Sequence, residues 1–297
     1  MKFKKQLSKF IIFSTLTFSS VFSYSCSCNQ KYIQQQKINL QKINSIKNPL
    51  GVWQWRIENI TIDSINFLVQ NNIKEIYLKV NEIGQKEKNI LQSLKQKGIK
   101  IYFLLGNKNF LLDDTKLITK INDYISFNQK EKLFEGIHLD IEPHQFNQEW
   151  KVLEKRKELI LKFLNLIKKL KNQFPLINFE YDIPFWFKDQ ITFDNKTKLL
   201  YEHIIDMANR TFFMLYRKQG IKIISLSKQI IEYAKQKDKQ IFICVETSKT
   251  DEENISFYES DKTTMVDELL VIAQNIPSHF GIAIHHLEAF EKLKEVK

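Results

Sequence analysis

The sequence predicts an α/β fold, a single (β/α)₈ barrel in which eight parallel strands alternate with helices. After residue 49, short apolar stretches alternate with amphipathic stretches of helical spacing, and this alternation occurs eight times. The segment has the length of one barrel, about 250 residues. No glycine-rich loop follows the first predicted strand, so the alternative of a doubly wound nucleotide-binding sheet has no support.

In the first half of the barrel, short runs rich in Val, Ile, Leu, Tyr and Phe predict strands at residues 51–55, 73–80, 99–105 and 136–142. Helices are expected between them, at residues 61–72, 90–97 and 115–129. Apolar residues recur at helical spacing from Ile62 to Val69. Gly98 ends the second helix, because glycine readily adopts the left-handed conformation found after a helix C-terminus.

In the second half, a long amphipathic helix is expected over residues 149–174, and Pro175 closes it because the residue before a proline disfavours helical geometry. The further strands are expected at residues 177–183, 211–216, 239–247 and 280–285. The further helices are expected at residues 196–207, 221–236 and 264–275, with a short helix near the end.

The fourth predicted strand carries a row of ionisable side chains. Apolar residues alternate with charged ones, so one face holds Ile137, Leu139 and Ile141 and the other holds His138, Asp140 and Glu142. Burying such groups costs several kcal/mol each, roughly, unless they are paired or used. At the C-terminal end of a parallel strand, where barrel enzymes build their sites, use is the favoured reason. The alternative is an edge strand with a solvated polar face.

Asp140 and Glu142 point the same way, with Cα atoms roughly 6.6 Å apart. Neighbouring carboxylates in a sheltered cleft raise each other's pKa, so Glu142 is expected to stay protonated near neutral pH and to act as a general acid. Asp140 is then expected to hold or polarise the attacking group. Two alternatives remain: the pair binds Lys79, Arg210 or Arg217, or it forms a metal site with His138. Because His138 lies one layer deeper and such sites usually draw ligands from several strands, we expect no metal and no cofactor.

Other strand ends supply further candidates. Tyr216 and Glu246, at the ends of the sixth and seventh strands, are candidate catalytic residues beside Asp140 and Glu142. The candidate substrate-binding residues are Trp53, Trp55, Lys79, His138, Asp182, Arg217, His285 and His286. Core packing is the alternative for the tryptophans and histidines, and a strand-end cap or a partner of Arg217 is the alternative for Glu246.

The segment from Glu135 to Glu142 resembles the DGxDxDxE motif of family 18 glycoside hydrolases, the chitinase-type barrels, and Met214 to Tyr216 resembles their MxY motif. The resemblance implies that Glu142 is the general acid and that Asp140 and Tyr216 hold a substrate acetamido group. Four positions depart from the family pattern: Glu135 and His138 replace aspartates, Arg217 replaces the Asp after the Tyr, and His285 stands in place of a tryptophan. The resemblance therefore implies a shared architecture rather than one substrate.

A second catalytic scheme uses Glu246 as the partner of Glu142 across the mouth of the barrel. Carboxyl groups about 5–5.5 Å apart would mean a retaining glycosidase, and about 6.5–9.5 Å an inverting one. The sequence leaves this distance open.

The first 25 residues resemble an export signal, since four lysines precede a short apolar run. Cys26 follows at the place of the lipidated cysteine of bacterial lipoproteins, with Cys28, plain secretion or an uncleaved anchor as alternatives. Each places the rest of the chain outside the cytosol, and we favour a lipid anchor in the bacterial cell membrane. Residues 26–48 are expected to form a polar tether, and residues 49–297 the barrel.

The net charge of +11 comes from lysines scattered along the chain, so we expect no nucleic-acid partner. Three cysteines give no disulfide framework, and Cys244 is expected to be a buried small residue. The favoured function is a monomeric, exported glycoside hydrolase acting on a polysaccharide. The alternatives are a non-catalytic surface lipoprotein that binds sugar and a metal-dependent hydrolase.

Overall fold

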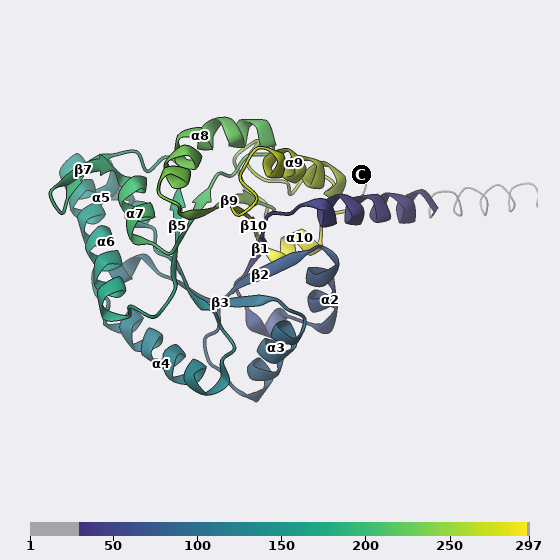
Figure 1. The fold of residues 1–297 in the computed structure, drawn as a ribbon, viewed down its shortest axis with the longest axis horizontal. Helices are drawn as coiled ribbons and strands as arrows, with labels where there is room; N and C mark the ends of the chain where they lie inside the picture. The colour runs from purple at the N-terminus through teal and green to yellow at the C-terminus, as the bar shows by residue number, and fades with distance from the viewer. Residues whose placement is uncertain (1–29, 296–297) are drawn as a thin grey trace, which may run out of the picture.

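The computed structural model describes residues 30–295 and contains a closed barrel of eight parallel strands (Figure 1). The strand order around the barrel is β1-β10-β9-β8-β5-β4-β3-β2, which confirms the predicted fold class. The strands are β1 (Leu50–Gln54), β2 (Ile73–Leu78), β3 (Lys100–Gly106), β4 (Gly136–Asp140), β5 (Phe179–Pro184), β8 (Arg210–Met214), β9 (Gln240–Glu246) and β10 (Gly281–His285).

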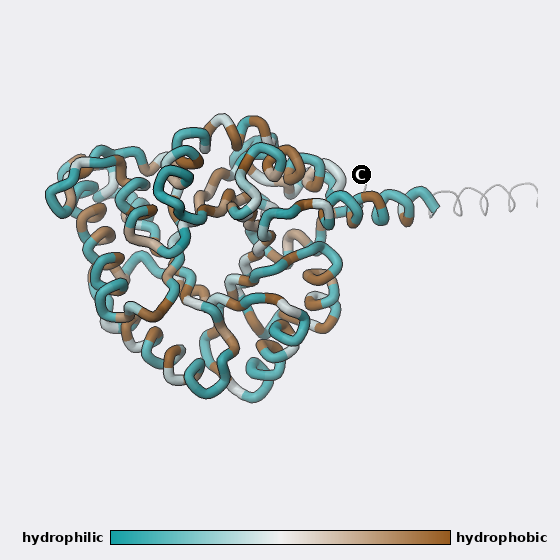
Figure 2. Tube along the Cα trace, in the orientation of Figure 1, coloured by the Kyte–Doolittle hydropathy of each residue, from teal (hydrophilic) through white to brown (hydrophobic). Residues whose placement is uncertain are grey.

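Helices surround the barrel and follow the strands in sequence (Figure 1). They are α2 (Ile62–Gln70), α3 (Gln85–Gln96), α4 (Thr115–Glu131), α5 (Asn147–Lys151), α6 (Leu153–Gln173), α7 (Leu200–Met207), α8 (Gly220–Gln236), α9 (Lys262–Gln274) and α10 (Leu287–Glu291). Short 3₁₀ helices are η1 (Ile57–Asn59), η2 (Lys108–Leu111) and η3 (Pro143–Gln145). Hydrophilic and hydrophobic residues alternate along the surrounding helices, as expected for helices that cover a sheet with one face (Figure 2).

Two apolar clusters stabilise the fold. The larger one fills the layer between strands and helices, and the smaller one lies inside the barrel. The inner cluster is mostly aromatic and includes Tyr77, Phe212 and Phe242. These rings fit inside the barrel because a glycine lies against them: a Cβ added to Gly281 would lie 2.0 Å from Phe242 Cε1. Cys244 belongs to this cluster as a buried free thiol, which confirms its expected burial.

Three predicted helices differ from the structure. The helix predicted over residues 90–97 begins five residues earlier, at Gln85, the first residue of α3. The helix predicted over residues 149–174 is interrupted at Val152, whose extended backbone (φ −94°, ψ 118°) separates α5 from α6. The helix predicted over residues 196–207 was wrong in its first four residues, because Lys196–Leu199 forms β7, which pairs with β6 (Gln190–Phe193) in an antiparallel hairpin. Asp194 and Asn195 make the turn with positive φ (49° and 61°), a conformation that Asp and Asn tolerate.

The segment expected to be a polar tether is helical over residues 30–45 and points away from the barrel in Figure 1. Its second half contacts the barrel layer: Asn39 is buried and donates to Glu295 Oε2 (2.8 Å), and Ile43 and Ile46 are buried in the outer core. The predicted export signal, Cys26 and Cys28 lie outside the described residues. Within residues 30–295, no helix combines the length and apolarity needed to cross a membrane.

Candidate active site

The C-terminal ends of the strands surround a cavity of about 550 Å³ that holds several of the predicted site residues. Glu142 follows β4, Tyr216 and Arg217 follow β8, and Glu246 ends β9; all four line this cavity. A cavity of this size fits a small ligand, because binding pockets usually measure about 300–1,000 Å³. The structure therefore brings together residues that lie more than 100 positions apart in sequence.

Glu142 is largely shielded from solvent, with 14% of its side chain exposed. Burial and the negative charge of Asp182 raise its pKa to about 7, against the lowering effects of a hydrogen bond from Gln145 Nε2 and of His285. His144 Nε2 lies 3.5 Å from Glu142 Oε1, but burial lowers the pKa of His144 to about 4. The imidazole is therefore neutral at pH 7, and the contact is not an ion pair.

Asp140 lies one layer below Glu142 on the same strand face. Burial and the charges of Asp182 and Glu142 hold its pKa well above the usual range, which favours the protonated form of its carboxyl group. Its Oδ1 has no hydrogen-bond partner among the described residues. Gly106 of β3 leaves the space for this side chain, since a Cβ there would lie 3.1 Å from the Asp140 carbonyl oxygen and 3.4 Å from Oδ2.

Glu246 differs from Glu142 because hydrogen-bond donors surround it. Its Oε1 accepts from the backbone N–H groups of Thr247 (2.8 Å) and Ser248 (2.6 Å), and its Oε2 contacts His285 Nδ1 (2.8 Å). Burial alone would raise its pKa, but the hydrogen bonds from His285 and Ser248 outweigh burial and lower it. Glu246 is therefore a fixed anion.

His285 is oriented from both sides. Trp55 Nε1 can only donate, and it lies 2.9 Å from His285 Nε2, so this nitrogen accepts. In this assignment Nδ1 carries the proton and donates it to Glu246 Oε2. Trp55, His285 and Glu246 therefore form a chain of hydrogen bonds along one side of the mouth.

Tyr216 packs near His285, with ring centroids 6.2 Å apart. Burial, followed by the charge of Glu246, holds the pKa of its phenol well above the usual range, so the hydroxyl keeps its proton. Arg217 donates from Nη1 to the Tyr216 carbonyl oxygen (2.6 Å), and its guanidinium lies 5.4 Å from the Phe185 ring centroid. Arg217 is therefore held at the cavity wall.

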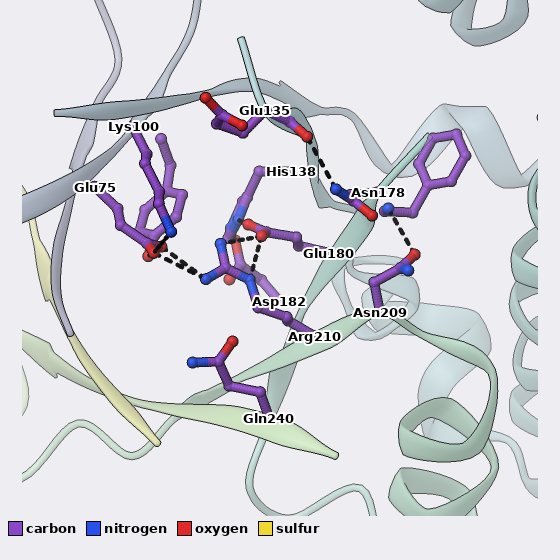
Figure 3. Close-up of polar contacts among 12 residues, drawn as sticks. Glu75, Lys100, Glu135, His138, Asn178, Glu180, Asp182, Asn209, Arg210 and Gln240 are labelled. Carbon is purple, nitrogen blue, oxygen red and sulfur yellow. Dashed lines mark hydrogen bonds and ion pairs between the residues drawn. The ribbon is translucent and has the colours of Figure 1, made fainter. Parts of the chain in front are cut away.

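Beneath this mouth, a column of buried charged side chains runs through the barrel interior beside the aromatic cluster (Figure 3). His138 is fully buried and lies between two carboxylates: Nδ1 is 3.0 Å from Glu180 Oε2, and Nε2 is 2.8 Å from Asp182 Oδ2. Burial alone would lower the pKa of His138, but the charges and hydrogen bonds of Asp182 and Glu180 outweigh burial and raise it from 6.5 to about 9. His138 is therefore a buried cation that donates to both, and Trp53 Nε1 donates to Asp182 Oδ2 (3.3 Å).

Arg210 continues the column toward the other end of the barrel (Figure 3). It pairs with Glu180 and, through Nη1, with Glu75 Oε2 (2.8 Å), and Lys100 lies 4.0 Å from Glu75 Oε1. Its guanidinium also stacks over Tyr102, 4.5 Å from the ring centroid. Arg210 is thus not the partner of Asp140 and Glu142 that one alternative proposed.

Sequence reasoning missed Glu75 and Glu180 as parts of this buried column. Their signal was an acidic residue within an otherwise apolar strand, in β2 and in β5. Such residues need a buried cation, and Arg210 provides it for both.

Three predicted substrate-binding residues lie too deep to contact a ligand in this structure. Trp53, His138 and Asp182 are 2%, 0% and 3% exposed. Their side chains point into the barrel, but strand alternation gives only the face of a residue, not its depth along the barrel axis.

The other predicted substrate-binding residues lie nearer the surface. Trp55, Arg217 and His285 are half-buried at the mouth, and His286 is half-buried beside them. Lys79 lies 6.0 Å from the Trp55 ring centroid and lines a separate cavity of about 200 Å³.

An aromatic cluster beside Glu142 was also missed. Trp186, in the turn after β5, packs edge-on against His144, with ring centroids 5.1 Å apart, and against Trp150 at 6.2 Å. These residues belong to loops and a short helix, where neither alternation nor helical spacing indicates a direction. Among the residues that the structure describes, no group of three or more His, Cys, Asp or Glu side chains is arranged to hold a metal ion.

No protein-family model and no curated protein matches the sequence. Among solved structures, a GH18 chitinase from Pseudoalteromonas aurantia is similar, with a TM-score of 0.56 and 11% identity over 80% of this chain and 94% of that one. An endo-beta-N-acetylglucosaminidase from Cordyceps militaris has a TM-score of 0.49 and 11% identity over 84% of this chain and 85% of that one. At 11% identity, the likeness to the Pseudoalteromonas aurantia structure shows a shared fold. The chain has the architecture of the chitinase-type barrels, as the motif on the fourth strand predicted.

Proposed function

We propose that the protein is a glycoside hydrolase that cleaves a glycosidic bond of a polysaccharide, with Glu142 as the general acid. The observation that supports this proposal is a pair of carboxyl groups in one cavity whose pKa values are pushed apart. The pKa of Glu142 is raised to about 7, whereas that of Glu246 is lowered. Such a pair supplies a proton donor and an anion at the same pH, which is what glycoside hydrolysis needs.

In this mechanism Glu142 donates its proton to the oxygen of the leaving sugar. Positive charge develops on the sugar ring as the bond breaks, and the Glu246 anion in the same cavity stabilises it. Tyr216 keeps its proton and can donate to a polar group of the substrate, and the raised pKa of Asp140 favours the same role for its carboxyl group. Trp55 and His285 act through Glu246 by fixing its orientation.

A second candidate function is sugar binding without turnover. It is favoured by the hydrogen bonds of Glu246: both oxygens already accept bonds from protein donors, which weakens the carboxylate as a nucleophile. A protein of this kind would hold a glycan in the cavity without cleaving it.

A reducing-sugar assay across a panel of polysaccharides separates the two functions. Glu142→Gln keeps the shape of the side chain but removes its titrating proton, and we expect it to reduce turnover by about 10²–10⁴-fold. Glu154→Gln is the matched control, because the Glu154 side chain is 80% exposed in the first turn of α6. Binding without turnover in the wild-type chain, or full turnover in Glu142→Gln, would contradict the proposed mechanism.

We also propose that the chain is exported and lipid-anchored through Cys26, on the strength of the basic and apolar pattern of residues 1–25. Feeding cells a labelled fatty acid and purifying the protein tests this. The label should appear on the wild-type chain and disappear in Cys26→Ser. Loss of the label in Cys28→Ser alone would move the anchor to Cys28, and an unlabelled wild-type chain would contradict lipidation.

A further inference from the structure

Trp186 is a large aromatic side chain that remains exposed although it lies in a well-packed part of the fold. Its relative exposure is 41%, and it lines the same cavity as Glu142. Exposed tryptophan is costly because its apolar ring stays in contact with water, and where such a ring lies beside a functional cavity it favours a binding role.

The surroundings of Trp186 hold its ring in place. The turn is closed by a hydrogen bond from the Phe187 backbone N–H to the Pro184 carbonyl oxygen (3.2 Å), and Phe187 itself is fully buried. Phe187 packs against the Trp186 ring at 5.1 Å with an interplanar angle of 81°, and stacks on Trp150 at 5.6 Å. A ring fixed in this way loses little side-chain entropy when a ligand binds.

The position of the ring is defined relative to Glu142. His144 contacts both, with its Nε2 3.5 Å from Glu142 Oε1 and its ring centroid 5.1 Å from that of Trp186. The His144 side chain therefore lies between Trp186 and Glu142, and both of these residues line a single cavity. A glycan chain that runs from Glu142 along the wall of this cavity meets the ring.

The charges of the cavity restrict the kind of glycan. Its acidic lining residues are Glu142, Glu246, Asp251 and Glu252, and Arg217 is the one Lys or Arg among the described residues that line it. Carboxylates of uronic acids or sulfate groups would be repelled by such a surface, whereas neutral and amino sugars would not.

We propose that Trp186 forms a sugar-stacking subsite next to the bond that Glu142 cleaves, and that this subsite takes a neutral or amino-sugar pyranose rather than an anionic one. This inference rests on the proposed function for the nature of the ligand. The apolar C–H face of the pyranose lies on the indole and removes apolar surface of both partners from water.

Calorimetric titration of the Glu142→Gln chain tests the subsite without interference from turnover. The probes are the hexamers of N-acetylglucosamine, glucosamine, glucose (β-1,4-linked) and galacturonic acid. We expect at least one of the first three to bind, and the galacturonate hexamer to bind at least about tenfold more weakly. No binding of any hexamer, or equal binding of the galacturonate hexamer, would overturn the proposal.

Variants made in the same Glu142→Gln background then locate the contact. Adding Trp186→Ala should weaken binding by about 10–100-fold, whereas Trp186→Phe, which keeps an aromatic face, should stay within a few-fold. Tyr32→Ala is the matched control, because Tyr32 is 47% exposed on the N-terminal helix. Unchanged affinity in Trp186→Ala would overturn the proposal.

Two outcomes separate this inference from the proposed function. Binding that depends on Trp186, together with a wild-type chain that releases no sugar, would keep the subsite and reject the hydrolase. Turnover that depends on Glu142, together with binding indifferent to Trp186, would keep the hydrolase and reject the subsite.

Discussion

At the scale of single residues, the two cavity carboxylates differ because of what surrounds them. Glu142 is buried near the negative charge of Asp182 and receives one side-chain hydrogen bond, whereas Glu246 accepts bonds from two backbone N–H groups and from His285. Burial without hydrogen-bond donors disfavours the charged carboxylate and raises the pKa, whereas hydrogen-bond donors favour the charged form and lower the pKa.

This contrast predicts the pH dependence of activity. The general acid must be protonated, so kcat/KM of the wild-type chain should fall as pH rises through about 7, where Glu142 loses its proton. A kcat/KM profile measured on the best polysaccharide of the screen gives the midpoint. Activity that stays constant through this range would show that another group is the acid.

Asp182 should influence the pH at which kcat/KM falls on the alkaline side of the profile (the alkaline limb), because its charge raises the pKa of Glu142. Asp182→Asn removes the charge at nearly constant shape and should move the limb to lower pH by on the order of one pH unit. The groups that face Glu142 from other elements, Tyr216, Arg217, Glu246 and His285, are left in place.

Glu180→Gln is the matched control for this prediction. It removes a charge from the same buried column and also contacts His138, but it does not affect the pKa of Glu142. We expect both variants to lose stability, so a shift of the alkaline midpoint in Asp182→Asn but not in Glu180→Gln would come from the charge of Asp182. The same alkaline midpoint of kcat/KM in Asp182→Asn and in the wild-type chain would contradict the prediction.

Residue-level patterns in the sequence predicted the faces of side chains and their order along one strand, but not the depth of one strand relative to its neighbours. Alternation placed His138, Asp140 and Glu142 on one face of the fourth strand, and Trp53 was predicted only as a residue at a strand end. The structure shows Trp53 and His138 buried and Glu142 at the cavity, because depth depends on how neighbouring strands are staggered. The sequence contains no direct signal of that stagger.

At the scale of elements, the close approach of β3 and β4 positions Asp140. Gly106 pairs with Asp140 in the parallel register, and its missing side chain leaves room for the Asp140 backbone and carboxyl group. A methyl group at this position would require the β4 end to shift by a few tenths of an ångström.

Gly106→Ala should therefore reduce activity more than stability. We expect a loss of kcat of roughly tenfold or more, because catalytic groups lose much of their effect when displaced by a fraction of an ångström to 1 Å. Gly98→Ala is the control: Gly98 has a φ of +75° after α3, and nothing lies within 4 Å of an added Cβ. It should cost about 1 kcal/mol of unfolding free energy and leave kcat unchanged. If kcat falls equally in both variants, the packing argument for Gly106 is wrong.

The elements themselves were predicted well where spacing was regular and poorly where turns decided the outcome. Every barrel strand was predicted within a few residues, since buried parallel strands are continuous apolar runs. The hairpin of β6 and β7 was missed because its turn uses Asp194 and Asn195 without a glycine, and the loop that carries Trp186 has no periodic signal at all.

At the scale of the whole molecule, the buried column links the stability of the barrel to pH. His138 lies between Asp182 and Glu180, and its pKa is raised from 6.5 to about 9 on folding. The folded state thus binds the His138 proton more tightly than the unfolded state does. The resulting stabilisation is complete below pH 6.5 and is lost as pH rises through about 9.

Urea unfolding at several pH values tests this link. The unfolding free energy of the wild-type chain should fall between pH 6.5 and about 9. His138→Asn should lower it by about 3–5 kcal/mol at neutral pH, because buried Asp182 loses its cation and Glu180 keeps only Arg210. The same variant should flatten the dependence of the unfolding free energy on pH in this range.

The control for His138 is another buried histidine. His203 is 5% exposed, and its Nε2 contacts the Ile191 carbonyl oxygen (2.9 Å) rather than a carboxylate. His203→Asn should leave the pH dependence of the unfolding free energy intact. A wild-type stability that rises over this range would contradict the assignment of His138 as a buried cation.

The eightfold alternation of strands and helices fixed the closed barrel from sequence, and closure brought Glu142, Tyr216 and Glu246 to one mouth. The charge column was not predicted as a unit, because its members come from β2, β4, β5 and β8 and meet only inside the closed barrel.

In the proposed mechanism Glu142 transfers a proton to the leaving sugar. Comparing substrates whose leaving groups do and do not need a proton tests this role most directly. A dinitrophenyl glycoside needs no proton to depart, whereas a natural glycosidic bond does. Glu142→Gln should therefore lose about 10²–10⁴-fold in kcat/KM on the natural linkage but stay within about tenfold of wild type on the dinitrophenyl glycoside. Equal losses on both substrates, or no loss on either, would contradict the role of Glu142 as general acid.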